Sequence, residues 1–166
     1  MSQAEELIRI LELKPHPEGG FYKETYRCEE FIAQTALNAR YSGPRSASTA
    51  IYFLHTADTF SVMHQVESDE LFHFYLGDPV EMLVLEPLGA QIFTIGSDVA
   101  SGQQPQLRIP RGAYQGCRVK SGGRFALLGC TVAPGFDFAD YHESKCADLQ
   151  KQYPQFHEMI AQLTRN

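Results

Sequence analysis

Short β-prone segments follow one another through most of this chain, and a turn signal separates nearly every pair. Glycine or proline turns stand at 77–79, 89, 96, 110–112 and 122–123. Segments rich in Val, Ile, Phe and Tyr at this spacing are typical of β-sandwiches and barrels. We therefore predict a mostly β protein. The predicted strands are 21–27, 48–55, 59–66, 70–76, 80–86, 90–96, 106–110, 114–120 and 124–133.

The two ends of the chain carry helical patterns instead. Ser2 and Glu5 fit a capping box ahead of apolar residues that share one helical face. From Ser144 onward, Phe156, Met159, Ile160 and Leu163 again share a helical face. Since no linker or repeat interrupts the chain, we predict that residues 1–166 form one domain with helices at both ends.

Composition excludes several classes of function. Of 166 residues, 43% are hydrophobic and 20% charged, which are globular values. A net charge of −6 with scattered basic residues argues against a nucleic-acid partner, because a phosphate backbone needs a basic patch. The sequence shows neither a membrane-length apolar run nor a signal segment, so we expect a cytoplasmic protein without a membrane partner. The four cysteines form no closely spaced pair and are expected to be reduced.

Strand periodicity gathers three polar side chains on one side of the sheet. In 59–66, His64 alternates in phase with Phe60, Val62 and Val66, which is the apolar and therefore inward set. A short connection at 67–69 predicts that 59–66 and 70–76 pair as a hairpin, which would bring Glu70 close to His64. Gln115 alternates with Cys117 and Val119 and would point inward as well.

A carboxylate and an imidazole buried together are costly unless they pair or bind something. The convergence of His64, Glu70 and Gln115 therefore predicts a binding site inside an apolar barrel. The alternative is a hydrogen-bonded His–Glu pair that only fills the core. His73 lies in the opposite phase to Glu70, which places it on the outer face.

The same residues resemble the two motifs of the cupin superfamily. "HQVESDELFHFYLG" matches the first motif at His64, Glu70 and Gly77, with Val66 where a histidine is usual. "PRGAYQ" matches the second at its proline and glycine, with Gln115 where a histidine is usual. Four further stretches, "HPEGGFYKETYR", "STAIYFL", "SDELFHFYLGDP" and "GCTVAPGFDF", resemble the cupin 5 subfamily of largely uncharacterised bacterial and fungal proteins.

The resemblance implies a jelly-roll barrel, also called a double-stranded β-helix, with a small-molecule pocket and a homodimeric assembly. It also implies a likeness of fold to the keto-deoxysugar epimerases, which are metal-free cupins. Two of the four usual metal ligands are absent, because Val66 donates nothing and Gln115 is a poor ligand for iron, zinc or copper. We therefore expect no cofactor; a divalent metal, if bound, would use His64, Glu70 and Gln115.

Three functions are compatible with these residues. The first is a metal-independent sugar or nucleotide-sugar epimerase or isomerase, with His64 as base, Glu70 orienting it, and Tyr22 or Tyr52 returning the proton. The second is a non-catalytic or storage-like cupin, in which His64, Glu70 and Gln115 hydrogen-bond a ligand without chemistry. In either case the predicted ligand-binding residues are Gln115, Phe72, Tyr22 and Tyr52. The third is an enzyme dependent on a divalent metal.

For the other polar and aromatic residues, the sequence favours a structural role or leaves the role open. His16 and Glu18, in "PHPEGG", lie in a turn and are expected to shape the backbone. Phe136 and Phe138 are expected in the core. The polar segment 29–45 is a candidate cover for the barrel mouth. Tyr22, Glu24 and Tyr26 share one strand face, which either lines an entrance or forms the wet side of an edge strand.

Overall fold

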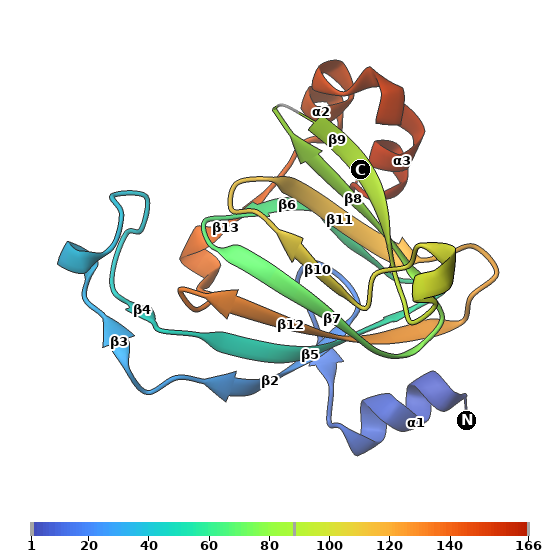
Figure 1. The fold of residues 1–166 in the computed structure, drawn as a ribbon, viewed down its shortest axis with the longest axis horizontal. Helices are drawn as coiled ribbons and strands as arrows, with labels where there is room; N and C mark the ends of the chain where they lie inside the picture. The colour runs from blue at the N-terminus through green and yellow to red at the C-terminus, as the bar shows by residue number, and fades with distance from the viewer. Residues whose placement is uncertain (1, 88, 166) are drawn as a thin grey trace.

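Two antiparallel sheets form a jelly-roll barrel in the computed structural model, which describes residues 2–87 and 89–165. The first sheet has the order β1-β2-β5-β12-β7-β10 and the second the order β13-β6-β11-β8-β9. Figure 1 shows the two sheets facing each other. The first sheet comprises β1 (Lys14–Pro15), β2 (Phe21–Arg27), β5 (Thr49–Thr56), β7 (Asp69–Gly77), β10 (Gln106–Ile109) and β12 (Phe125–Ala133). The second comprises β6 (Phe60–Val66), β8 (Val80–Glu86), β9 (Gly89–Ile95), β11 (Tyr114–Val119) and β13 (Tyr141–Glu143).

The nine predicted strands are all present, and the fold class is confirmed. The pairing of 59–66 with 70–76 is wrong, however. β6 and β7 lie in different sheets, so the connection at 67–68 carries the chain from one sheet to the other. A two-residue link between β-prone runs fits a corner between packed sheets as well as a hairpin, which is why spacing alone misassigned it.

Both ends of the chain form the predicted helices. α1 (Gln3–Ile10) begins with a complete capping box between Ser2 and Glu5. The C-terminal segment forms α2 (Cys146–Gln152) and α3 (His157–Gln162), joined by the single turn η4 (Pro154–Phe156). Pro154 ends the first of these helices because proline has no N–H for an intrahelical bond. None of the helices in residues 2–87 and 89–165 has the length and apolar character needed to cross a bilayer.

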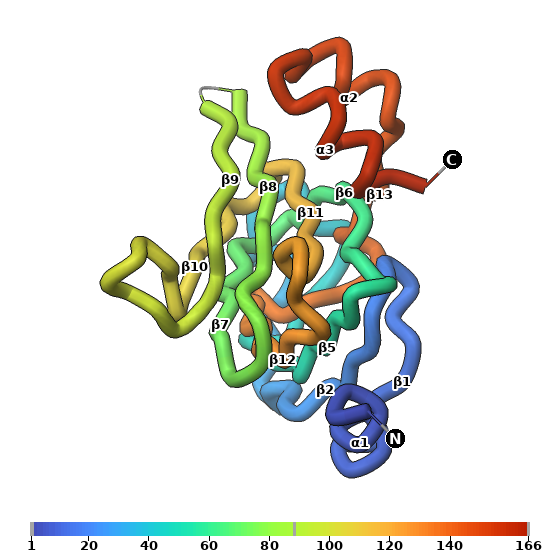
Figure 2. The backbone as a smooth tube through the Cα atoms, turned by 90° about the vertical axis from the view of Figure 1, so that its right-hand side faces the viewer, coloured from blue at the N-terminus to red at the C-terminus, as the bar shows by residue number. Residues whose placement is uncertain are grey.

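Apolar side chains fill the space between the sheets and also cover two outer faces. The inner cluster includes Phe53, Phe72 and Leu128. On the outside of the second sheet, Met63 and Leu83 pack against Leu149, Ile160 and other residues of α2 and α3. Figure 2 shows these helices beside β6 and β13, while α1 lies at the other end of the molecule. The sheets are therefore buried on both faces over much of their area.

The segment predicted to cover the barrel mouth projects away from it. It contains β3 (Phe31–Ile32), η1 (Gln34–Ala36) and β4 (Arg45–Ser46), and Figure 1 shows it as an arm extending from the barrel. In the part of the chain that the structure describes, none of its residues lines the cavity inside the barrel. Its base is fixed by Arg45, which forms a buried ion pair with Asp140 in η3 (Phe138–Asp140).

Candidate functional site

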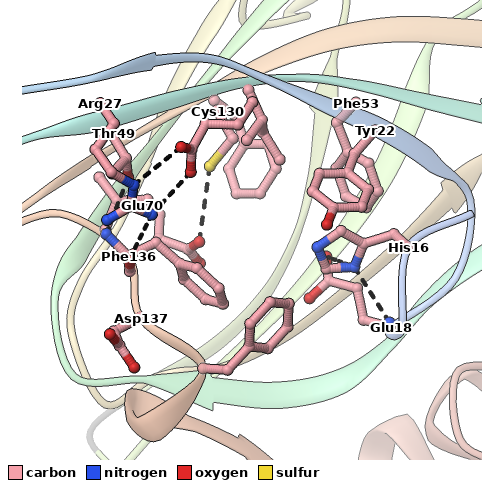
Figure 3. A pocket seen from close by; sticks show the side chains of 15 residues that line it. His16, Glu18, Tyr22, Arg27, Thr49, Phe53, Glu70, Cys130, Phe136 and Asp137 are labelled. Atoms are coloured by element: carbon pink, nitrogen blue, oxygen red, sulfur yellow. Dashed lines mark hydrogen bonds and ion pairs between the residues drawn. The ribbon is translucent and has the colours of Figure 1, made fainter. Parts of the chain in front are cut away.

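A cavity of about 430 Å³ opens inside the barrel, which is a usual size for a small-molecule site. Its walls come from β2, β5, β7 and β12, together with the loop before β2 and the segment after β12 (Figure 3). The apolar lining consists of Tyr22, Ile51, Phe53, Phe72, Val132, Phe136 and Phe138; the polar lining consists of His16, Glu18, Glu24, Arg27, Thr49, Glu70, Cys130 and Asp137.

Glu70 and Glu18 are buried carboxyl groups of the cavity, with 6% and 7% of their surfaces exposed. One oxygen of Glu70 accepts a hydrogen bond from the Gln115 side-chain amide, and the other faces the Cys130 thiol at 3.6 Å. Burial raises the pKa of Glu70 to about 7, and the nearby His64 opposes this shift. A carboxyl group with this pKa exchanges its proton readily near neutral pH.

His64 points inward as predicted, but its direct partner is Glu18 rather than Glu70. Its Nε2 lies 3.3 Å from Glu18 Oε2, and its Nδ1 lies 2.7 Å from the carbonyl oxygen of Val62. Because a carbonyl only accepts, Nδ1 must carry a proton. A carboxylate facing the other ring nitrogen is then favourable only if a second proton lies between them. Glu18 and His64 therefore form a buried pair joined at Oε2 and Nε2.

The loop before β2 brings Glu18 and His16 to the cavity, which the sequence interpretation missed. Gly19 and Gly20 both have positive φ, 114° and 70°, a conformation that glycine adopts readily. A Cβ at Gly20 would lie 2.8 Å from the His55 ring, so only glycine lets the loop approach the barrel this closely. The Val62 amide donates to the Glu18 carbonyl at 2.9 Å, which holds this loop against β6.

His16 sits beside Glu18 as a neutral imidazole. Burial lowers the pKa of His16, and its Nδ1 accepts a hydrogen bond from the Glu18 amide at 3.2 Å. Its ring makes an edge contact with Tyr22, with 4.4 Å between ring centroids. The only signal of this role in the sequence was a polar pair directly before a Gly-Gly turn. That signal is weak because it also describes an ordinary loop.

Figure 3 places Glu70 and Cys130 on one side of the cavity and His16 and Glu18 on the other. Two carboxyl groups, those of Glu70 and Glu18, therefore face a common space from different sides. His64 does not line the cavity; it stands behind Glu18, with its ring 5.0 Å from the Tyr141 ring, centroid to centroid. Its contact with the cavity lining runs through the Glu18 side chain.

The remaining predicted residues divide between the cavity and other places. Tyr22 and Phe72 line the cavity, and Gln115 supports Glu70 from behind. Tyr52 does not reach the cavity. It lies on the outer face of β5, where its ring centroid is 6.0 Å from that of Tyr75. Because both faces of β5 carry apolar residues, its alternation did not reveal that Tyr52 points outward.

Three other expectations, for His73, for the phenylalanines after β12 and for the face of β2, have different outcomes. His73 lies outside the cavity as expected, where its Nε2 is 3.1 Å from the Thr131 hydroxyl. Phe136 and Phe138 line the cavity, and Phe138 is 51% exposed, so the core assignment of Phe138 is wrong. On β2, a bulge after Glu24 breaks the alternation, with the result that Arg27 rather than Tyr26 joins the cavity wall.

The donor set does not fit the four-ligand metal site usual for this fold. Val66 has no donor atom. The Gln115 side-chain N–H donates to one carboxylate oxygen of Glu70, and this hydrogen bond occupies the oxygen. His64 has its Nδ1 on a carbonyl and its Nε2 on Glu18. Within the described residues, no three His, Cys, Asp or Glu side chains gather closely enough to hold a metal ion.

Comparison with known proteins identifies the family. A model of the Cupin_5 family, described as "Cupin superfamily (DUF985)", matches residues 5–143. The chain belongs to the Cupin_5 family. This cupin is 27% identical over 159 residues to Uncharacterized protein YML079W of Saccharomyces cerevisiae, covering 90% of this chain and 79% of the yeast protein.

Two solved structures of similar proteins have the same architecture. A hypothetical protein from Leishmania major superposes with a TM-score of 0.89 at 31% identity, covering 99% of this cupin and all of that chain. Protein SO0799 from Shewanella oneidensis gives a TM-score of 0.85 at 34% identity, covering 99% of both chains. The resemblance inferred from the motifs is therefore confirmed at the level of family and fold.

Proposed function

We propose that this cupin binds a small hydroxylated molecule, such as a sugar derivative, and transfers a proton on it as an isomerase or epimerase. The observation that carries the proposal is the placement of Glu70 and Glu18 on opposite walls of one cavity. The pKa of Glu70, near 7, leaves it partly ionised at neutral pH, and Glu18 shares a proton with His64. One wall can thus accept a proton while the other supplies one.

The proposed step takes place at a carbon next to a carbonyl group of the ligand. Ionised Glu70 takes the proton from that carbon, and the electron pair of the C–H bond moves into the enolate. The proton held between Glu18 and His64 then forms a new C–H bond from the opposite face. The configuration of the carbon is inverted. Glu70 is then protonated, and the Glu18–His64 pair has one proton fewer than before. Transfer of one proton from Glu70 to the Glu18–His64 pair restores the starting state. Side chains of this chain supply both acid and base.

Replacing Glu70 with glutamine is expected to reduce proton exchange at least about 100-fold, because the amide cannot accept the proton. The assay incubates the protein with a panel of free aldoses and ketoses in D₂O and follows deuterium incorporation next to the carbonyl by NMR. The matched control is Glu6→Gln on exposed α1, which removes the same charge far from the cavity and should leave exchange unchanged. Equal exchange in Glu70→Gln and the native protein would contradict the proposal. Calorimetric binding of a panel compound without any exchange would favour a cupin that only binds.

Replacing His64 with glutamine is expected to lower the maximal exchange rate by about 10- to 100-fold with little change in KM. The substitution removes the partner with which Glu18 shares its proton, while the cavity wall itself stays intact. Initial rates over a range of substrate concentrations separate the two parameters. A rise in KM with an unchanged maximal rate would show that His64 supports only the shape of the cavity.

A further inference from the structure

The charged groups that line the cavity are mainly acidic. Four carboxyl groups face it, from Glu18, Glu24, Glu70 and Asp137. Arg27 is the one lysine or arginine among the lining residues that the structure describes. The balance of charge in a partly enclosed space attracts ligands of opposite sign and repels those of the same sign.

Arg27 is not free to bind an anion. Its guanidinium donates to both oxygens of Glu24, at 2.9 and 2.8 Å, and to the Phe136 carbonyl at 3.2 Å. A bidentate pair of this kind is neutral as a unit. His16, the other basic side chain of the lining, is kept neutral by burial. Among the lining residues that the structure describes, a phosphate or carboxylate would therefore find no unused positive charge.

Glu70 is the complementary case of a buried acid without a cation beside it. Its two contacts come from neutral groups, the Gln115 amide and the Cys130 thiol. The nearby basic side chain of His64 already contacts Glu18, at 3.3 Å. A ligand cation placed near Glu70 would supply the missing counter-charge where the low dielectric makes it most effective.

Aromatic rings complete this environment. Tyr22, Phe53, Phe72, Phe136 and Phe138 all line the cavity. Ring faces attract cations, most strongly when water is displaced, and they also pack against the carbon skeleton of a sugar. The combination of buried acid and aromatic wall discriminates by charge as well as by shape.

We propose that the cavity selects small molecules that carry an amino or other cationic group, such as amino sugars, and rejects phosphorylated ones. This inference rests on the proposed function in so far as both place the ligand in the same cavity. It narrows the substrate class, since a phosphorylated or nucleotide-linked sugar brings negative charge into an acidic space.

Three sugars that differ only at carbon 6 test the selection by isothermal titration calorimetry at pH 7 and low salt. 6-Amino-6-deoxyglucose is expected to bind at least about 10-fold more tightly than glucose, and glucose 6-phosphate more weakly than glucose. Equal affinities for the amino sugar and glucose, tighter binding of the phosphate, or no binding of the amino sugar would each overturn the inference.

Variants locate the preference within the cavity. Glu70→Gln is expected to reduce the affinity for the amino sugar about 10-fold and to change that for glucose by less than about threefold. Glu6→Gln alters the net charge equally but should preserve the preference. Loss of the preference in both variants would mean that the charge of the whole protein, not Glu70, produces it, and would overturn the assignment.

Isotope exchange is a separate readout that distinguishes this inference from the proposed function. Selectivity for the amine without exchange would contradict only the proposed chemistry. Exchange without selectivity would contradict only the inference.

Discussion

Asp140→Asn is expected to lower the free energy of unfolding by about 3–5 kcal/mol. Asp140 accepts two hydrogen bonds from Arg45, at 2.7 and 2.6 Å, and the two side chains are only 2% and 5% exposed. Removing the carboxylate leaves the guanidinium charge buried without compensation. Thermal unfolding followed by circular dichroism should show a midpoint lower by about 10 °C.

An exposed ion pair of the same protein provides the control. Lys23 and Glu12 lie 2.6 Å apart, but their side chains are 42% and 76% exposed. Lys23→Met should therefore leave the midpoint unchanged, because exposed pairs are screened by solvent. A decrease in Asp140→Asn no larger than that in Lys23→Met would contradict the importance of burial. The double variant Arg45→Met, Asp140→Leu removes both charges and should recover much of the lost stability.

Acidification from pH 6.5 to 3 is expected to remove about 5 kcal/mol of stability through His55 alone. Burial lowers the pKa of His55 from 6.5 to about 3 in the folded protein. Below pH 6.5 the unfolded chain takes up a proton at this residue and the folded protein does not. The stabilisation is therefore complete above pH 6.5 and is lost as the pH falls through 3.

Glu70 has the opposite dependence on pH. Burial raises its pKa from 4.5 to about 7, so the folded protein binds the proton more tightly than the unfolded chain. Its contribution, about 3 kcal/mol, is complete below pH 4.5 and is lost as the pH rises through 7. Between pH 4.5 and 6.5 the two slopes cancel, and these residues together predict a plateau of stability.

Urea unfolding at half-unit steps of pH tests this plateau. In Glu70→Gln only the His55 slope remains, so stability should rise from pH 4.5 to 6.5 instead of staying level. The native protein and Glu6→Gln should both keep the plateau. Parallel curves for Glu70→Gln and the native protein would show that Glu70 titrates at an ordinary pKa.

The alternation of strand residues predicted the inward side chains well. It placed His64 and Gln115 inward, and both are buried, because a half-turn per residue fixes the face whatever the strand pairs with. For Glu70 the alternation left both faces open, and its inward position rested on the expected hairpin with 59–66, which is wrong although Glu70 is buried. Which strands pair with each other was harder to predict from the sequence. The short link at 67–68 was mistaken for a hairpin turn, since local sequence does not record which sheet the next strand joins.

The site was only half visible in the sequence for the same reason. Glu70 and Phe72 lie on a regular strand and were found, whereas Glu18 and His16 lie in a loop to which no periodicity applies. Arg27 was hidden by the bulge that shifts β2 by one residue. Proximity of Glu18 to His64 depends on contacts between distant segments, which only the folded chain reveals.

The loop of Glu18 is held in place mostly by its backbone. Its Gly-Gly turn, the His16 N–H bond to the Gly20 carbonyl and the Val62 bond to the Glu18 carbonyl leave the Glu18 side chain out of the scaffold. Glu70, in contrast, depends on the side chains of Gln115 and Cys130. A change at position 18 would therefore leave the loop intact and require compensation at His64, its buried partner, while a change at position 70 would require coordinated replacement of both Gln115 and Cys130. The two walls of one cavity would then diverge at different rates.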